Sequence, residues 1–86
     1  MIILYCGLKQ KYLISQIEKF KINEQHVFKF IKKDTHNNIK LYFDTILEDD
    51  GEACHIMKNI ILRSDFGQIL FFNIVSFDGE KITWFH

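Results

Sequence analysis

The feature that most limits how this chain can fold is a change of hydrophobic period near its middle. From Ile39 to Leu47, apolar and polar residues alternate, which is typical of a strand with one buried face. A few residues later, the apolar positions recur at intervals of three and four, the spacing of one face of an α-helix. They are Ala53, Ile56, Met57, Ile60 and Ile61. Because a strand period and a helix period follow each other so closely, the sequence predicts a mixed α+β domain.

The first half of the chain is predicted to hold one helix and three strands. The apolar run Ile2–Cys6 predicts a strand buried on both faces, and Leu8–Phe20 has the spacing of an amphipathic helix. The segments His26–Lys33 and Ile39–Leu47 flank a turn-forming stretch and predict a β-hairpin. A helix over Glu24–Lys33 is the alternative for the first arm of that hairpin.

The second half is predicted to hold one helix and two strands. The helix spans Gly51–Arg63, and several acidic residues lie at its start, where the positive end of the helix dipole favours them. The segment Ile69–Phe77 is apolar on both faces and predicts an interior strand. An Asp78-Gly79 turn then leads into a last strand over residues 81–86.

Together these elements predict a single α+β domain over residues 1–86, in the order β-α-β-β-α-β-β. The first six elements match the ferredoxin-like βαββαβ order, to which an extra C-terminal strand is added. In that arrangement the sheet is rich in antiparallel pairs, both helices lie on one face, and the other face stays open. The extra strand takes the edge position, which leaves the apolar strand Ile69–Phe77 in the interior of the sheet.

The composition points to a partner that covers apolar surface. An apolar content of 48%, with 15% aromatic residues, is high for a domain of 86 residues, so part of the apolar surface is expected to be covered from outside. No apolar run approaches the ~18 residues of a membrane span, and the pattern of a signal peptide is missing. Two cysteines are too few for a disulfide scaffold. We therefore expect a cytoplasmic protein with reduced thiols and no membrane partner.

Charges are unevenly distributed along the chain, although they sum to zero. Residues 1–43 contain eight Lys and three acids, a net charge of +5, and residues 44–86 contain two Lys, one Arg and eight acids, a net charge of −5. Zero net charge and a single arginine argue against nucleic acid as a partner. The RNA recognition motif shares the βαββαβ order, but its third-strand signature needs a glycine that the segment around Tyr42 and Phe43 lacks.

Candidate catalytic and metal-binding residues lack the patterns that such chemistry needs. Cys54 and His55 are adjacent on a predicted helix, where neighbouring side chains point ~100° apart and cannot form a nucleophile–base pair. The His and Cys residues do not have the spacing of zinc ligands. The triplet Asp65-Phe66-Gly67 occurs in protein kinases as a metal-binding element, but the accompanying kinase motifs are missing. We expect a protein that is not an enzyme and that binds neither a cofactor nor a metal.

By elimination, the sequence predicts a small module that binds another protein. We expect an inhibitor or neutraliser, of the toxin-immunity or phage anti-defence type, which acts by covering a surface of its target. A homo-oligomeric accessory subunit, such as a homodimer paired through the open sheet face, is the alternative. A nucleic-acid-binding module ranks third.

The binding surface is expected on the open face of the sheet. One row of the strand Ile69–Phe77 should stay uncovered there, together with aromatic residues of the hairpin and of the last strand. Tyr and Trp are frequent binding hot spots, and acids at the rim would steer a basic partner, such as a toxin or a nuclease, to this surface. The predicted partner-binding residues are Tyr42, Asp44, Glu48, Asp49, Asp50, Phe72, Trp84 and Phe85.

Overall fold

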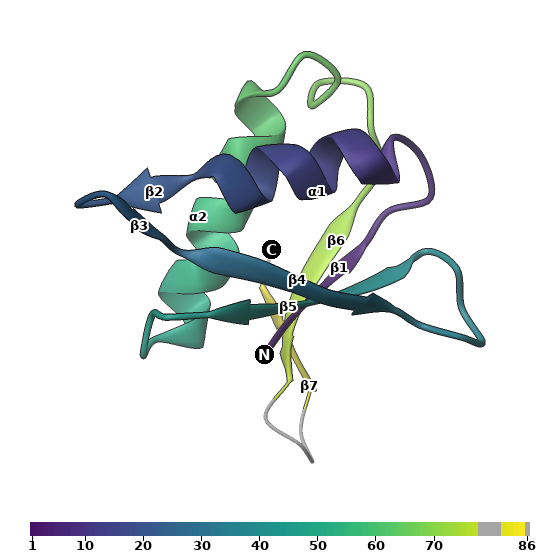
Figure 1. Ribbon diagram of the computed structural model, residues 1–86. Helices are drawn as coiled ribbons and strands as arrows, with labels where there is room; N and C mark the ends of the chain where they lie inside the picture. Colours follow the sequence, from purple (N-terminus) through teal and green to yellow (C-terminus); the bar gives the residue numbers. More distant parts are fainter. Residues whose placement is uncertain (78–81, 86) are drawn as a thin grey trace.

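The structure is a computed structural model that describes residues 1–77 and 82–85, the latter by their backbone alone. Within these residues the chain forms two helices and seven strands (Figure 1), and neither helix has the length and apolar content of a membrane-spanning segment. The elements are β1 (Ile2–Tyr5), α1 (Gln10–Lys19), β2 (Lys21–Ile22), β3 (Gln25–His26), β4 (Phe28–Lys33), β5 (Lys40–Thr45), α2 (Asp50–Arg63), β6 (Asn73–Phe77) and β7 (Ile82–Phe85).

Five of these strands form one antiparallel sheet in the order β4-β5-β1-β6-β7, with β1 at its centre. The register places Ile2 of β1 opposite Phe43 of β5 and Ser76 of β6. Strand β7 takes the edge position beside β6, as predicted, and β2 and β3 form a separate hairpin. The prediction of a small α+β domain with an antiparallel sheet and two helices is confirmed.

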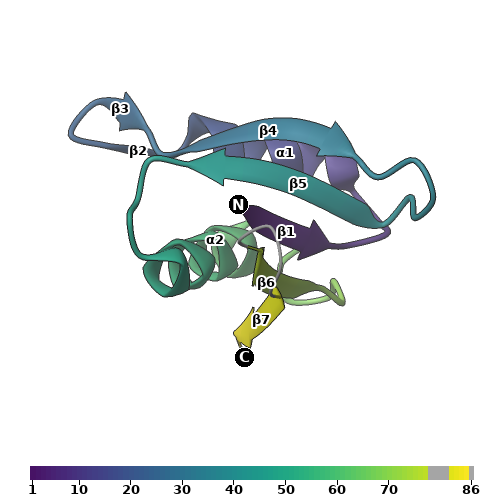
Figure 2. The ribbon, with the colours of Figure 1, turned by 90° about the horizontal axis from the view of Figure 1, so that it is seen from below.

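Both helices cover the same face of the sheet. Helix α1 packs on β4, α2 packs on β1 and β6, and the two helices contact each other. Figure 2 shows the molecule turned by 90° and seen from below, with α1 behind β4 and β5. The face that neither helix covers is called the helix-free face below.

The hydrophobic core lies between the sheet and the helices. Alternate residues of three adjacent strands point into it, because successive side chains of a strand point to opposite faces. Burial of each large core side chain contributes about 1.5–3 kcal/mol relative to exposure. The predicted apolar stripe of the second helix is confirmed. The core includes Ile2 and Leu4 of β1, Leu41 and Phe43 of β5, Ile74 of β6, Leu13 and Ile17 of α1, and Ala53, Met57 and Ile61 of α2.

The predicted strand Ile69–Phe77 is wrong in its first four residues. Strand β6 begins at Asn73, and residues 64–72 form a loop in which two backbone N–H groups donate to the carbonyl oxygen of Phe66. Turns of this kind use the backbone groups that a strand would offer to its neighbours. The error has a physical reason, since an apolar loop and a buried strand both show a continuous apolar run.

The first arm of the predicted hairpin is β4, so the alternative of a helix over Glu24–Lys33 is wrong. The unpredicted β2–β3 hairpin precedes it, and its turn residues Asn23 and Glu24 have φ of 52° and 65°. Two consecutive left-handed residues are typical of a type I′ turn, which Asn-Gly signals more clearly than Asn-Glu. Strand β4 also contains a bulge between Phe30 and Lys32.

Candidate functional site

Three loops meet at the end of the sheet where β1 and β4 end and where β5 and β6 begin. They are residues 6–9 between β1 and α1, residues 34–39 between β4 and β5, and residues 64–72 between α2 and β6. Adjacent strands of this sheet are antiparallel, so these connections come to the same end, on the right of Figure 2. We call this region the loop end.

The start of α1 holds the first two of these loops together. The side-chain amide of Gln10 donates to the carbonyl oxygens of Cys6, at 2.8 Å, and of Asn38, at 2.6 Å. The backbone N–H of Cys6 in turn donates to the carbonyl oxygen of Ile39 at 2.8 Å. Each such hydrogen bond contributes on the order of 1 kcal/mol, so the loop between β4 and β5 is fixed to the centre of the sheet.

The third loop is anchored on α1 through Phe66. Its ring packs edge to face on Tyr12, with the centroids 5.2 Å apart, and Lys9 Nζ lies 4.6 Å from the Phe66 centroid. The Tyr12 hydroxyl also accepts a hydrogen bond from the backbone N–H of Asp65 at 3.2 Å. Lys9 has a left-handed φ of 59°, a conformation that costs about 1–2 kcal/mol in a residue with a Cβ and that these contacts offset.

Four large apolar side chains of the loop end face the solvent. Phe71 is 97% exposed, Ile69 75%, Leu8 70% and Ile39 40%. Single exposed apolar residues are normal, but these four come from three neighbouring loops that are held in place. Sequence reasoning missed this grouping, because it assigned Ile69 and Phe71 to a strand and selected neither Leu8 nor Ile39. The available signal was the apolar run directly after Gly67, which is equally typical of a strand.

The helix-free face differs from the predicted apolar-aromatic surface in its described residues. Ile3 and Val75 lie on this face and are almost fully buried. The predicted row of exposed residues is absent from β6, since Ile69 and Phe71 precede the strand. The side chains of Trp84 and Phe85 lie outside the described residues, so their assignment to the binding surface stays a prediction.

Lysine and tyrosine side chains occupy the middle of this face. Tyr42, a predicted site residue, is half-buried, and Lys32 Nζ lies 5.2 Å from its ring centroid. Lys40 Nζ lies 5.4 Å from the Tyr42 centroid and 5.9 Å from the Tyr5 centroid. The Tyr42 hydroxyl donates to Asp34 Oδ1 at 3.4 Å. The three lysine–tyrosine contacts are cation–π pairs. The pKa of the Lys40 ammonium is raised, mainly by a hydrogen bond with Tyr42.

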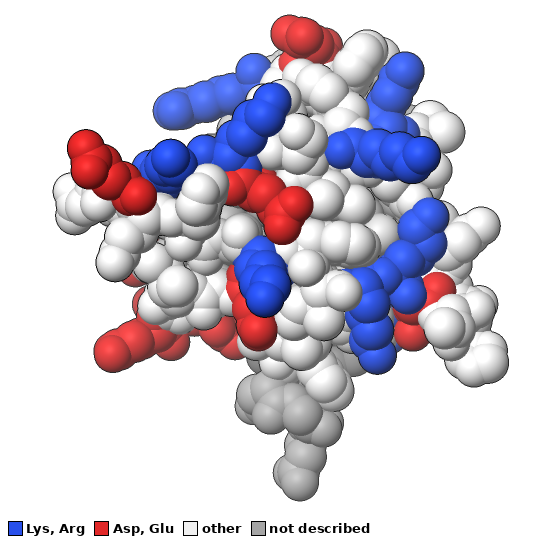
Figure 3. Space-filling model, viewed as in Figure 1, with Lys and Arg blue, Asp and Glu red and all other residues white. Residues whose placement is uncertain are grey.

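Of the four predicted acidic rim residues, two accept hydrogen bonds within the fold and the other two are exposed. Asp49 is the N-cap of α2 and accepts hydrogen bonds from two backbone N–H groups of its first turn. Asp50 accepts a hydrogen bond from the Ser76 hydroxyl at 2.7 Å. Asp44 and Glu48 are exposed. Figure 3 shows acidic side chains gathered at the lower left, where α2 begins, and several lysines over β4, β5 and α1, with single acids among them.

Phe72, another predicted site residue, lies on the helix side of the sheet. It is half-buried and packs against the core. With Cys54 and Lys58 it lines a small pocket of about 210 Å³ beside α2. Part of its apolar surface is therefore used in folding, and its assignment to the partner-binding surface stays a prediction.

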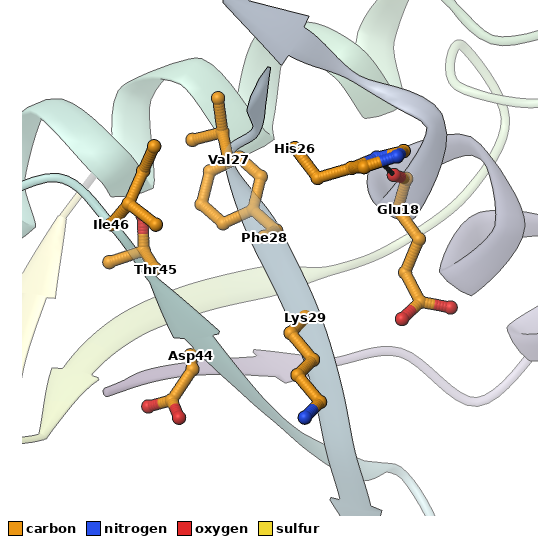
Figure 4. A pocket seen from close by; sticks show the side chains of 8 residues that line it. All are labelled: Glu18, His26, Val27, Phe28, Lys29, Asp44, Thr45 and Ile46. Carbon is orange, nitrogen blue, oxygen red and sulfur yellow. Dashed lines mark hydrogen bonds between the residues drawn. The ribbon is translucent and has the colours of Figure 1, made fainter. Parts of the chain in front are cut away.

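A larger groove of about 840 Å³ opens at the far end of β4 and β5 (Figure 4). Two contacts shape it: His26 Nδ1 lies 2.7 Å from the carbonyl oxygen of Glu18, and the Glu18 carboxylate accepts a hydrogen bond from the backbone N–H of Phe30 at 3.1 Å. The second contact satisfies a donor on the outer edge of β4, which an edge strand otherwise leaves open. The lining residues are Glu18, His26, Val27, Phe28, Lys29, Asp44, Thr45 and Ile46.

Both cysteines are buried and free, at 2% exposure for Cys6 and 1% for Cys54. Burial, and secondarily the charge of Asp50, raise the pKa of the Cys54 thiol to about 11. The thiolate is the nucleophilic form of cysteine, so at neutral pH Cys54 stays protonated. Adjacent His55 is exposed, on another side of the helix.

The raised pKa of Cys54 predicts a specific loss of stability in alkali. The folded protein keeps the proton to a higher pH than the unfolded chain does. The stabilising contribution is therefore complete below the ordinary thiol pKa of ~8.5 and is lost as the pH rises toward 11. We expect Cys54→Ala to show a smaller fall in the free energy of unfolding across this interval than the wild type, measured by urea denaturation at each pH. An equal fall in the free energy of unfolding of the two proteins would contradict the raised pKa of Cys54.

Comparison of the chain with protein-family models, with curated proteins and with solved structures finds no match. In the part of the chain that the structure describes, no three His, Cys, Asp or Glu side chains are grouped so that they could hold a metal ion.

Proposed function

We propose that this protein binds another protein through its loop end and inhibits that protein by covering part of its surface. The observation that carries the proposal is Phe71, whose side chain is 97% exposed on a loop that is anchored through Phe66. Burial of a phenylalanine side chain contributes about 1.5–3 kcal/mol, and at Phe71 this free energy is available to a partner. Leu8 and Ile69, on the loops of the same end, are exposed as well.

Because these loops are already ordered, their exposed apolar side chains are suited to binding a partner. Association costs free energy for every loop that has to become ordered. Here Gln10 fixes two of the three loops, and Phe66, Tyr12 and Lys9 fix the third, so this cost is small. Preorganised apolar anchors of this kind are typical of binding hot spots.

The sheet order supports a ferredoxin-like arrangement as the scaffold that we propose for this surface. Strands β4, β5, β1 and β6 are neighbours in that order, and one helix follows β1 while the other follows β5. The central strand is antiparallel to both of its neighbours, as the split βαβ order requires. The hairpin β2–β3 and the edge strand β7 are additions to this scaffold.

Inhibition by occlusion is the narrower part of the proposal. A standard interface buries ~800 Å² on each partner, which is a small part of the 5834 Å² surface of this protein. One end of a small domain can therefore cover a functional site of a larger target, as toxin-immunity and phage anti-defence proteins do. The free, buried thiols of Cys6 and Cys54 fit a reducing cytoplasm, where we propose that the target is met.

A matched pair of serine variants tests the proposed surface. Phe71→Ser removes the central anchor, and Ile46→Ser makes the same kind of change at an apolar residue that is 59% exposed at the opposite end of the sheet. We expect tagged wild-type protein and Ile46→Ser to capture the same target from the cells that produce it. For Phe71→Ser we expect the affinity for that purified target to fall ~30-fold or more, since loss of a hot spot costs ≥ ~2 kcal/mol.

Two outcomes would count against this proposal. Equal affinities of wild type and Phe71→Ser for the target would remove the loop end as the binding surface. A dimer that forms with rising protein concentration in light scattering, and that Phe71→Ser abolishes, would instead assign the surface to a second copy of the chain. The homo-oligomeric alternative would then replace the inhibitor.

A further inference from the structure

The helix-free face presents lysine and tyrosine side chains from three adjacent strands. Tyr5 of β1 lies opposite Lys40 of β5, and Tyr42 of β5 lies opposite Lys32 of β4. Directly opposite residues share a face of the sheet, and Tyr5 and Tyr42 are diagonal neighbours on it. Four side chains from distant parts of the sequence are therefore placed within reach of one another.

The bulge in β4 is what places Lys32 in this group. Phe30 pairs with Phe43, so an unbroken register would place Ile31 opposite Tyr42 and turn Lys32 toward the helices. The bulge adds one residue and restores Lys32 to the helix-free face opposite Tyr42. Bulges that redirect a side chain in this way are frequent beside functional sites.

The centre of this face is positively charged as well as aromatic. The acids Asp34 and Asp44 lie toward its two ends, where Asp34 accepts a hydrogen bond from the Tyr42 hydroxyl and Asp44 lies opposite Lys29. Between them, the described residues of β4, β5 and β1 contribute no acid to this face. The zero net charge of the chain hides this separation, because four of the eleven acids, Glu48, Asp49, Asp50 and Glu52, lie near the start of α2.

We propose that this face binds single-stranded nucleic acid, with the amines of Lys32 and Lys40 on phosphate groups and with bases stacked on Tyr5 and Tyr42. A basic surface with aromatic rings beneath it is the arrangement that binds single strands with little sequence preference. The lysines now lie over the tyrosine rings, but such exposed cation–π contacts are weaker than the stacking of a base. A lysine has a long flexible side chain and can leave the ring for a phosphate. The proposal goes beyond the protein-binding function and concerns a separate surface.

Binding is tested with a fluorescently labelled oligothymidylate of about 12 nucleotides, a length that one small domain can cover. Fluorescence anisotropy is measured at salt concentrations between about 50 and 200 mM. We expect Lys32→Gln/Lys40→Gln to lower the slope of log affinity against log salt by about 1.4, which is ~0.7 for each lost phosphate contact on a single strand. The double variant Lys19→Gln/Lys21→Gln makes the same change in charge at two exposed lysines outside this face and should keep the wild-type slope.

Stacking is tested separately from charge. We expect Tyr5→Leu and Tyr42→Leu each to weaken binding about 10-fold, while Tyr5→Phe and Tyr42→Phe keep most of it, because phenylalanine still offers a ring to a base. Circular dichroism of each variant confirms that it is folded, and Phe71→Ser should bind the oligonucleotide like the wild type. The proposal is overturned if the wild type does not bind the oligonucleotide at the lowest salt concentration. It is also overturned if both double lysine variants lower the slope of log affinity against log salt equally. Competition by polyglutamate as strong as that by the oligonucleotide would assign the face to an acidic protein segment instead.

Discussion

Replacement of Gly67 by alanine is expected to destabilise the protein by about 3 kcal/mol or more, because the loop 64–72 packs on the last turn of α2 without space for a side chain. A Cβ at this position would collide with the carbonyl oxygen of Ile61 and would lie 2.7 Å from the Cα of Leu62. Both are backbone atoms, so neither can move without distorting the helix. The loss is a large part of the roughly 4–13 kcal/mol expected for a domain of this size.

Gly7→Ala is the matched control for this variant. A Cβ at Gly7 meets only the Cγ2 atom of Ile39, at 3.3 Å, which is the end of a half-exposed side chain that can shift. We expect Gly7→Ala to change the free energy of unfolding by less than about 1 kcal/mol, measured by urea denaturation of both variants. Similar stabilities of the two variants would show that the loop does not pack on α2 as described.

Phe43→Ala is expected to cost about 3–5 kcal/mol, the usual loss for a large aromatic side chain removed from a core. Phe43 is fully buried on β5, opposite Ile2, and its ring packs on Phe30 with the centroids 5.5 Å apart. The same substitution at Phe71, which is 97% exposed, should change the stability by no more than about 0.5 kcal/mol. Chemical denaturation of both variants measures the contrast.

This comparison also bears on the proposed function. If Phe71→Ala were to destabilise the protein by several kcal/mol, the side chain would be part of the folded core, and no free energy would be left for a partner. A small effect at Phe71, next to a large one at Phe43, separates the residues used for folding from those available for binding.

Much of the fold could be predicted because its buried side chains are regularly spaced. The alternation around Leu41 and Phe43 identified β5 and its inner face, and the stripe from Ala53 to Ile61 identified α2. The acid Asp49 marked the start of that helix, where it caps two backbone N–H groups. In each case the physical cause is local, since one element buries one face.

The loop end could not be predicted from the same patterns. The run after Gly67 has the apolar content of a strand, but in the structure Gly67 lies close to Ile61 and the backbone turns around Phe66. The β2–β3 hairpin depends on left-handed φ values at Asn23 and Glu24, and the sequence signal for the second is weak. The candidate surface on the helix-free face was harder to predict than the fold. Lys32 reaches this face only because of the bulge in β4, and the alternation of apolar and polar residues does not show where a bulge shifts the register.

Photo-crosslinking from position 71 inside the producing cells is the most direct test of the central claim that the loop end binds another protein. A benzoylphenylalanine probe in place of Phe71 keeps the apolar, exposed character of the residue, and the same probe in place of Ile46 is the control. We expect one discrete adduct from position 71 that contains a protein other than this one, and no such adduct from position 46. No adduct from position 71, adducts shared by both positions, or an adduct of two copies of this chain would contradict the claim.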